Sequence, residues 1–486
     1  MTTGGCRRAA LAGAALVALV AAPARADDLR GALAQAYAGN PTLLAAREQL
    51  RATDAGVPLA RADALPSVSV SASETEYVRQ SELNTYDMPR MLNVSGSASL
   101  PLYSGGAVHN AVKAANIRVM AGRGDLLSAE ANVFNQTVAA YLDVIRTDAI
   151  VALNRNQVKA LEVNLKATTD RFQIGDVTRT DVAQSQSRLA LAVGTLRNAE
   201  ASLVQARETY IQIIGKEPEA LAPPPQLPNL PATAEDAVTI ALQTNPDMAA
   251  ARERSKAAGF DTSAAQSSRL PKVSLFADVG YTDYLNSLNY PVVPGLVLAQ
   301  RAKNADVGIR ATLPLYQGGR PSAEIKQAQA REGQALDTEI ATERQVIANT
   351  RAAFSSWRAA QQVIEATKTA VDSAELSLKG VRAENGVGNR TVLDILNAEQ
   401  ELINAQVQLV TAQRNAYVAG FTLLVAMGKG GARDLGLDGG ALYDPLIHAR
   451  SARSEYTDWG GDKVQGAGKP TRTVDTRAQT GSTSGN

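Results

Sequence analysis

The sequence of 486 residues has few of the side chains that build catalytic or metal sites. It contains one cysteine, Cys6, and two histidines, His109 and His448, which lie far apart without a metal-binding spacing. It has no phosphate-binding loop and no nucleophile elbow. We therefore expect no catalytic residue, no cofactor and no bound metal, and we do not expect an enzyme.

Aromatic residues and long hydrophobic runs are also scarce. Aromatics make up 4% of the chain, whereas hydrophobic residues, many of them Ala, Leu and Val, make up 45%. This composition favours slim, closely packed helices over a thick aromatic core. Beyond the N-terminal segment no stretch approaches about 18 consecutive apolar residues, the length that predicts a membrane-spanning helix. If the chain crosses a membrane, it must do so with strands.

The first 26 residues have the three parts of a secretory signal. Arg7 and Arg8 give a positive start, residues 9–22 are apolar and uncharged, and Ala24-Arg25-Ala26 matches the small-x-small cleavage pattern. Removal of this segment takes away the only cysteine and leaves 46 basic and 48 acidic residues, a net charge of −2. A near-neutral chain without basic clusters is not expected to bind nucleic acid.

An internal repeat is the most informative feature. Asn40-Pro41 and Leu65-Pro66 recur 205 residues later. From Leu100-Pro101-Leu102-Tyr103 onward the interval is 213 residues. The longer interval also relates Gly175 to Gly388, Asp181 to Asp394, and Gly215-Lys216 to Gly428-Lys429. A net insertion of eight residues between Pro271 and Leu313 explains the change, so the chain holds two copies of one design.

The repeat and the composition divide the chain into five segments. These are a signal peptide (1–26), a first repeat (27–217), a proline-rich linker (218–232), a second repeat (233–428) and a polar C-terminal tail (429–486). The linker holds six prolines and is expected to be extended. The tail is expected to be disordered, because Gly, Ser, Thr and charged residues dominate it.

Each copy predicts one helix, two strands and two long helices. In the strand segments, apolar residues alternate with Ser, Asn, Gly or charged residues over 67–73, 92–100, 273–280 and 306–313. The alternation fits a membrane β-barrel with lipid outside and water inside, although a soluble sandwich gives the same pattern. Four tyrosines lie at strand ends and fit either an aromatic girdle or ordinary strand positions: Tyr77, Tyr103, Tyr281 and Tyr316.

The helices after the strands are expected to be unusually long. Residues 107–173 contain no proline, and a helix of this length would reach roughly 100 Å. The next helix, from Asp181, carries a heptad in which one row is apolar and the other is mostly Ala, and the second copy repeats it from Ile395. A seven-residue period imposes supercoiling, and small residues let neighbouring helices approach closely.

Four strands cannot close a barrel. In lipid, an open sheet would expose unpaired N–H and C=O groups at its edges. The smallest outer-membrane barrels have about eight strands, so at least two chains must share one barrel. Both strand pairs leave and return on the same side, which places every helix in the periplasm.

Two segments resemble the helix-turn-helix tips of the TolC family of outer-membrane proteins, namely 171–182 and 387–394. The Asn-Pro, Leu-Pro and Leu-Pro-Leu-Tyr-x-Gly-Gly elements fit the same family over residues 28–428. The resemblance implies a mainly α chain with membrane β-strands, which forms a homotrimer with a shared twelve-stranded barrel and a twelve-helix periplasmic tunnel. It implies an outer-membrane exit duct for type I protein secretion or multidrug efflux. Its implied partners are a periplasmic adaptor (membrane fusion) protein and an inner-membrane pump of the ABC or RND type.

The resemblance also implies a gate at the tips. Asp394 matches a position that forms an aspartate ring at the tunnel entrance, and Thr180, Asp181 and Arg390 match polar links that hold the entrance shut. Closely spaced carboxylates in such a ring should have raised pKa values. Read from the residues alone, Thr180 and Asp181 can equally be helix N-caps.

Four positions depart from the family pattern. Asn397 replaces a second acid of the ring, and Asn385 stands where the family often has Tyr, so a weaker gate is expected. Ile174-Gly175 and Val387-Gly388 resemble an adaptor-docking Val-Gly-Leu motif, but Asp176 and Asn389 replace the leucine. Gly175 and Gly388 can equally be helix C-caps.

Two rival functions remain beside the duct. A trimeric coiled-coil stalk or adhesin with a barrel anchor would use the same heptads without transport. A periplasmic adaptor would also be a helical hairpin protein, but the two copies and the absence of an anchor argue against it. The sequence names neither the cargo nor the pump.

Overall fold

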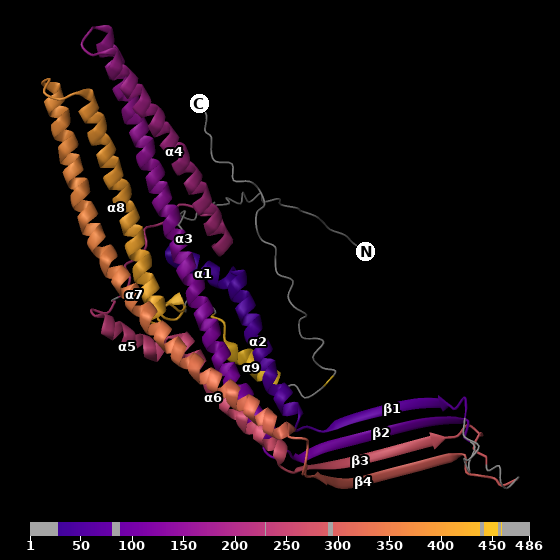
Figure 1. Ribbon diagram of the computed structural model, residues 1–486. Coiled ribbons are helices and arrows are strands. Elements are labelled where there is room, and N and C mark those ends of the chain that lie inside the picture. The colour runs from indigo at the N-terminus through magenta and orange to yellow at the C-terminus, as the bar shows by residue number, and fades with distance from the viewer. Residues whose placement is uncertain are drawn as a thin grey trace, which may run out of the picture.

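The computed structural model describes residues 28–79, 88–228, 230–289, 295–437, 442–454 and 458. The expected signal peptide and residues 459–486 of the expected tail lie outside these ranges. The molecule is elongated, with two long helical hairpins at one end and a four-stranded sheet at the other (Figure 1).

The two copies place their elements in the same order. The first copy contains α1 (Leu29–Gly39), α2 (Pro41–Ala62), β1 (Ser67–Glu76), β2 (Arg90–Tyr103), α3 (Ala107–Gln173) and α4 (Arg179–Ile214). The second contains α5 (Ala234–Thr244), α6 (Pro246–Gln266), the 3-10 helix η1 (Ser267–Arg269), β3 (Lys272–Asp283), β4 (Arg301–Thr312), α7 (Arg320–Gly386) and α8 (Val392–Ala426). One further helix, α9 (Pro445–Ser454), follows.

The expectation of a single helix before each strand pair is wrong. The Asn-Pro dipeptide splits that helix in two, because the Asn40 side chain accepts hydrogen bonds from the N–H groups of Thr42 (2.9 Å) and Leu43 (3.3 Å) and so begins α2. Pro41 occupies the first helical position, where no N–H is needed. Asn245 begins α6 in the same way.

The four strands form one antiparallel sheet in the order β1-β2-β3-β4. One face is polar: the hydroxyls of Ser69 and Ser97 lie 2.8 Å apart, and Asp278 pairs in register with Asp306. The other face leaves apolar side chains bare, with Val70 76% and Val307 77% exposed. The predicted alternation is therefore present, and β1 and β4 are the two edges.

Two helices of 67 residues, α3 and α7, run from the sheet to the tips. Toward the tips α4 packs on α3 and α8 on α7, whereas toward the sheet α2 and α6 take those places (Figure 1). The rows of small residues face neighbouring helices, since Ala199, Ala206, Ala405 and Ala412 are buried. None of the helices in the described ranges is long and apolar enough to cross a bilayer.

The main hydrophobic core lies near the middle of α3, where α4 and α8 end. Its largest buried side chains are Phe134 and Tyr141 of α3, Tyr210 of α4 and Phe421 of α8. The described residues of the linker contain no helix. Leu227 packs so tightly on Gly420 that a Cβ at position 420 would lie 2.5 Å from a leucine methyl group.

Part of the tail that the sequence predicts to be disordered is folded. Ala432 and Leu437 are buried in the main core, and α9 packs along α2. The physical reason is local composition: the first part of this segment still carries apolar residues, whereas the Gly- and Ser-rich part begins later. The disorder prediction is therefore wrong for residues 429–437 and 445–454.

Candidate functional site

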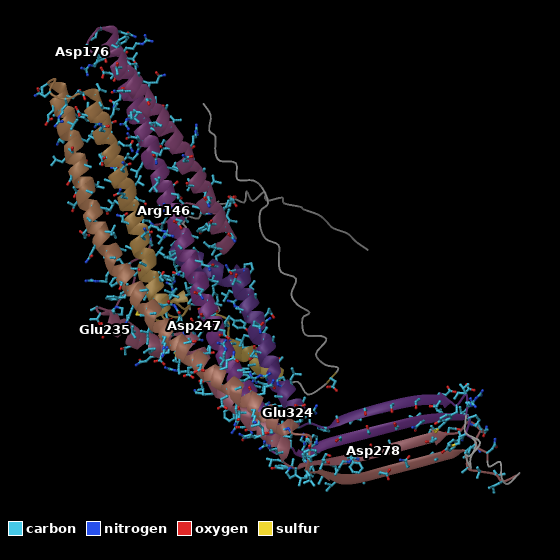
Figure 2. All side chains as sticks on the ribbon, in the orientation of Figure 1. Arg146, Asp176, Glu235, Asp247, Asp278 and Glu324 are labelled. Atoms are coloured by element: carbon cyan, nitrogen blue, oxygen red, sulfur yellow. The ribbon has the colours of Figure 1, made fainter. Side chains whose placement is uncertain are left out.

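The two helical tips lie at the end of the molecule opposite the sheet, as the labels on Asp176 and Asp278 show (Figure 2). Both long helices end in the same way. Gly175 has φ +83° and Gly388 has φ +84°, a left-handed conformation that favours glycine. The N–H of Gly175 donates to the carbonyl of Phe172 (3.0 Å) and that of Asp176 to Arg171 (2.9 Å), which is the Schellman pattern. The C-caps are Ile174 and Val387, and the two glycines follow them as the left-handed residues of the capping motif. Adaptor docking there remains a prediction.

The returning helices α4 and α8 begin with matching capping boxes. Asp181 Oδ2 accepts hydrogen bonds from the N–H (2.9 Å) and hydroxyl (2.7 Å) of Thr178, while its own N–H donates to that hydroxyl (3.3 Å). Thr391 and Asp394 repeat this geometry at 2.9, 2.8 and 3.3 Å. The N-cap reading of Thr180 and Asp181 is therefore wrong: the cap is Thr178, and Asp181 is its partner three residues on.

Thr178 and Thr391 were not predicted as N-caps, although the sequence contains a signal for both. Thr-x-x-Asp is the capping-box pattern, and it occurs at 178–181 and 391–394. Thr180 lies in the first turn of α4 with its side chain exposed.

The capping boxes set the charge of both aspartates. Hydrogen bonds from the Thr178 hydroxyl and N–H lower the pKa of Asp181 below its usual value. The N–H and hydroxyl of Thr391 likewise lower the pKa of Asp394. In a single protomer each carboxylate binds its own helix N-terminus, which favours its charged form. The ring of like charges remains a prediction about the assembled protein.

Arg390 bridges its own turn. Its Nε donates to Glu384 Oε2 (2.8 Å), and this carboxylate raises the pKa of the Arg390 guanidinium. At the other tip Arg171 pairs with Asp176 (2.7 Å) in a similar way. None of the hydrogen bonds described for Thr180, Asp181 and Arg390 reaches the other hairpin of the same protomer. The structure therefore does not join these predicted lock residues within one chain.

Other residues do join the two hairpins. Near the tips, Arg188 of α4 donates to Asn397 Oδ1 of α8 (2.9 Å), and Asn164 of α3 donates to both oxygens of Glu399 of α8 (3.1 Å each). The sequence indicates only that Asn397 replaces an acid of the predicted ring; in the structure it is a hydrogen-bond acceptor. The sequence gives no sign of these pairs, because their members lie more than 200 positions apart.

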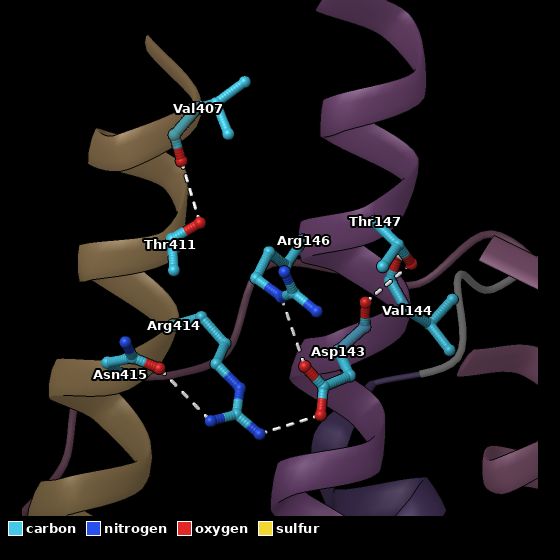
Figure 3. A network of polar contacts seen from close by, with 8 residues as sticks. All are labelled: Asp143, Val144, Arg146, Thr147, Val407, Thr411, Arg414 and Asn415. Atoms are coloured by element: carbon cyan, nitrogen blue, oxygen red, sulfur yellow. Dashed lines mark hydrogen bonds and ion pairs between the residues drawn. The ribbon is translucent and has the colours of Figure 1, made fainter. Parts of the chain in front are cut away.

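A second polar link between the two hairpins is an ion pair near their middle. Figure 3 shows Arg414 reaching from α8 to Asp143 of α3, where the ion pair measures 2.7 Å, with Arg146 on the other carboxylate oxygen at 3.2 Å. In the described part of the chain, no group of three or more His, Cys, Asp or Glu side chains is placed to hold a metal ion.

The profile of a known family, "Outer membrane efflux protein", matches residues 32–216 and 237–429, one stretch in each copy. The chain belongs to this family. It is 31% identical over 436 residues to the outer membrane efflux protein BepC of Brucella suis, covering 89% of this chain and 92% of that protein. It is 26% identical over 430 residues to the outer membrane protein TolC of Escherichia coli, covering 87% and 86%. The crystal structure of the outer membrane protein VceC of Vibrio cholerae aligns with a TM-score of 0.69 at 23% identity, covering 82% of this chain and 96% of that one.

These findings confirm the resemblance to the TolC family, the outer-membrane location and the role of an outer-membrane exit duct. The likeness to VceC confirms the fold, a mainly helical chain with two strands in each repeat. The family is one of channel proteins rather than enzymes. Among the readings weighed from the sequence, the duct is thus favoured over the stalk or adhesin and over the adaptor.

Proposed function

We propose that three copies of this chain form one exit duct, with twelve strands closing a shared barrel and the helices continuing it as a periplasmic tunnel. The observation that carries the proposal is the open sheet. Among the described residues, β1 and β4 each have one edge without a partner, and the apolar face is bare. In lipid each unsatisfied backbone group costs several kcal/mol, so other copies of the chain must pair with both edges.

The helices support the same assembly. α3 and α7 are both 67 residues long, but α3 buries 22 residues and α7 only five, because α3 is central in the protomer and α7 lies at its edge. Apolar side chains of α7 stay about half or more exposed, including Leu336, Ile340, Val363 and Leu376. A neighbouring protomer packed against α7 would bury them.

We assign the gate to the helical tips. Asp181 and Asp394 both have lowered pKa values and are ionised at neutral pH, so three protomers would bring about six carboxylates to the entrance. We assign Thr180 and Arg390 to links between protomers, because none of their described hydrogen bonds reaches the other hairpin of the same chain.

The outermost residues are assigned to adaptor docking. Ile174 and Val387, beside Gly175 and Gly388, are 80% and 74% exposed although apolar. Such bare apolar side chains at the far end of the duct suit contact with a periplasmic adaptor, which in turn would connect to an inner-membrane pump of the ABC or RND type. Efflux is supported by the similarity to the outer membrane efflux protein BepC, and type I secretion by the resemblance to the TolC family. We expect no enzyme activity.

Single-channel recording tests the duct. Protein purified from the outer membrane would be placed in a planar bilayer, and a trivalent cation added to each side in turn. A small, stable conductance that is blocked only from the helical side supports both the duct and the acidic entrance. If folded oligomer gave no conductance, the duct would be rejected in favour of a stalk; a large pore without block would reject the role of Asp394.

The lock is tested by Arg390→Ala. We expect a severalfold rise in conductance, because the guanidinium that holds the entrance is lost. Arg171→Ala is the matched control, since Arg171 spans the other tip turn with an equivalent ion pair but is not assigned to the lock. Equal conductance of Arg390→Ala and the unaltered protein would rule out the assignment, and equal effects of both variants would assign them to tip structure alone.

A further inference from the structure

The two copies give the polar face of the sheet different chemistry. In the first copy this face is lined by serines, whose hydroxyls pair across β1 and β2, as Ser69 and Ser97 do at 2.8 Å. In the second copy the same face carries one aromatic and three charged side chains, namely Phe276, Asp278, Asp306 and Arg310. The resemblance between the copies therefore does not extend to this face of the sheet.

The two aspartates are direct neighbours. Asp278 of β3 pairs in register with Asp306 of β4, and like charges opposite each other destabilise a sheet. Among the described residues, Asp278 has no hydrogen-bond or ion-pair partner, and Asp306 accepts one hydrogen bond, from Asn304 Nδ2 (3.3 Å). The two negative charges are therefore not neutralised within the protomer, and they add nothing to the stability of the sheet.

A positive charge lies on the same face, nearer the helices. Arg310 is four positions from Asp306 along β4, which is about 13 Å in a strand. Its guanidinium carbon lies 4.6 Å from the centre of the Phe276 ring, a cation–π contact. The ring lies on Gly308, where a Cβ would be 2.9 Å from Phe276 Cζ. The guanidinium is thus held along the wall of the sheet, and no ion pair among the described residues neutralises it.

We propose that the second copy builds a charge filter inside the barrel. It has an arginine level (Arg310 on Phe276) nearer the helices and an aspartate level (Asp278 and Asp306) farther from them. This inference rests on the proposed function, since the polar face lines a lumen only in the shared barrel. Three chains would supply about six carboxylates and about three guanidinium groups, so the filter favours cations over anions.

The filter is distinct from the acidic tips. Asp278 lies in the sheet, at the opposite end of the molecule from the tips (Figure 2). Water in the lumen solvates charged side chains, which explains why an aspartate pair that destabilises the sheet is tolerated on this face. Charged cargo would therefore meet a second selection by charge after it has passed the helical entrance.

Cysteine probes measure the charge at each level. Cys6 lies in the expected signal segment, so an added cysteine would be the only thiol of the mature chain. Ser97 pairs in register with Asp278, and Ser97→Cys therefore reports the aspartate level. Ser99 pairs with Phe276, and Ser99→Cys reports the arginine level. The purified oligomer is treated with a cationic trimethylammonium or an anionic sulfonate thiol reagent, and the cation-to-anion ratio of the two reaction rates is compared between variants.

We expect a higher ratio at position 97 than at position 99, measured at about 0.01 M salt, where screening acts over about 30 Å. Asp278→Asn should lower the ratio at position 97 about tenfold, because a unit charge about 6 Å away in water changes the concentration of each reagent about threefold, in opposite directions. Arg310→Gln should raise the ratio at position 99. Lys303→Gln is the matched control and should change neither ratio, since it removes the same charge from the opposite face of the same strand.

The outcomes separate the filter from the barrel. If both thiols react but their ratios are equal and unaffected by Asp278→Asn and Arg310→Gln, the filter is overturned, whereas the water-filled barrel stands. An effect of Lys303→Gln as large as that of Arg310→Gln also overturns the filter, because net charge rather than position would then decide the ratio. If neither thiol reacts in the folded oligomer, the polar face lines no lumen, and the shared barrel is rejected together with the filter.

Discussion

At the residue scale, Asn40 and Asn245 each perform two tasks. Their side-chain oxygens cap α2 and α6, and their Nδ2 groups donate to the last turns of α4 and α8: Asn40 to the carbonyl of Ile213 and Asn245 to that of Ala426, both at 2.9 Å. The Asn-Pro repeat is therefore a junction that joins the break between two short helices to the end of a long one. Carbonyls at a helix C-terminus lack partners within the helix, which explains why an amide is used.

We expect Asn40→Ala to lower the free energy of unfolding by about 2 kcal/mol, since a helix cap and a hydrogen bond to a terminal carbonyl are both lost. Asn40→Ser is the matched control. It keeps a capping oxygen but loses the donor to Ile213, so its loss should be smaller. Thermal melting followed by circular dichroism in detergent checks both variants. An Asn40→Ala protein as stable as the unaltered one would contradict the junction.

At the element scale, the folded part of the tail ties the end of the second repeat to the start of the first. The N–H of Ala432 donates to Glu130 (2.5 Å), and that of Tyr443 donates to the hydroxyl of Tyr37 (2.9 Å). On α9, His448 lies 3.3 Å from the carboxylate of Asp54, a side chain only 1% exposed. The segment acts as a strap over α1 and α2, and burial raises the pKa of Glu130 beneath it.

Removal of residues 443–486 is expected to lower the melting temperature by several degrees. The deletion removes the packing of α9 along α2 and the hydrogen bond between Tyr443 and Tyr37, and both losses lower the free energy of unfolding. A chain ending at Asp458 is the control, because it keeps all described contacts of the strap. Identical melting temperatures of the two shortened chains would show that the strap adds no stability.

At the scale of the whole molecule, the protomer leaves surfaces uncovered that other copies of the chain would cover. In the part of the chain that the structure describes, the sheet has two unpaired edges, and the 67-residue helix α7 is far less buried than its counterpart α3. If protomers pack side by side around a common axis, the sheet edges pair with neighbouring sheets and α7 is buried against the next protomer. The pore, the tunnel and any ring of aspartates would exist only in that assembly.

The α7 surface gives a test of assembly. Leu376 is 72% exposed in the protomer. Leu376→Asp should prevent the trimer from forming, because a carboxylate would be buried between protomers, whereas Leu376→Met should leave it intact. Light scattering in detergent, corrected for bound detergent, measures the mass. A trimer of the Asp variant as stable as that of the Met variant would place Leu376 outside the interface.

Local periodicity explains what the sequence determined by itself. The alternation in the four strands, the long proline-free helix over 107–173 and the two-copy design all follow from patterns along the chain or from direct repetition. All three are found in the structure. The prediction of a single helix before each strand pair was wrong, because a capping residue, rather than hydrophobic periodicity, decides where that helix ends. The capping boxes at Thr178 and Thr391 were missed for the opposite reason, since their pattern is present in the sequence. At the first tip the cap was assigned to Thr180 and Asp181, and at the second tip none was assigned.

Only the tertiary structure decided which residues join the hairpins. Asn164 and Glu399 lie 235 positions apart, and Asp143 and Arg414 lie 271 apart, so no local pattern relates them. From the sequence, Asn397 only replaces an acid of the predicted ring. In the structure α4 places Arg188 beside it as a hydrogen-bond donor. A polar side chain acquires its role from the partner that folding places within about 3 Å, and that partner is set by how whole helices pack.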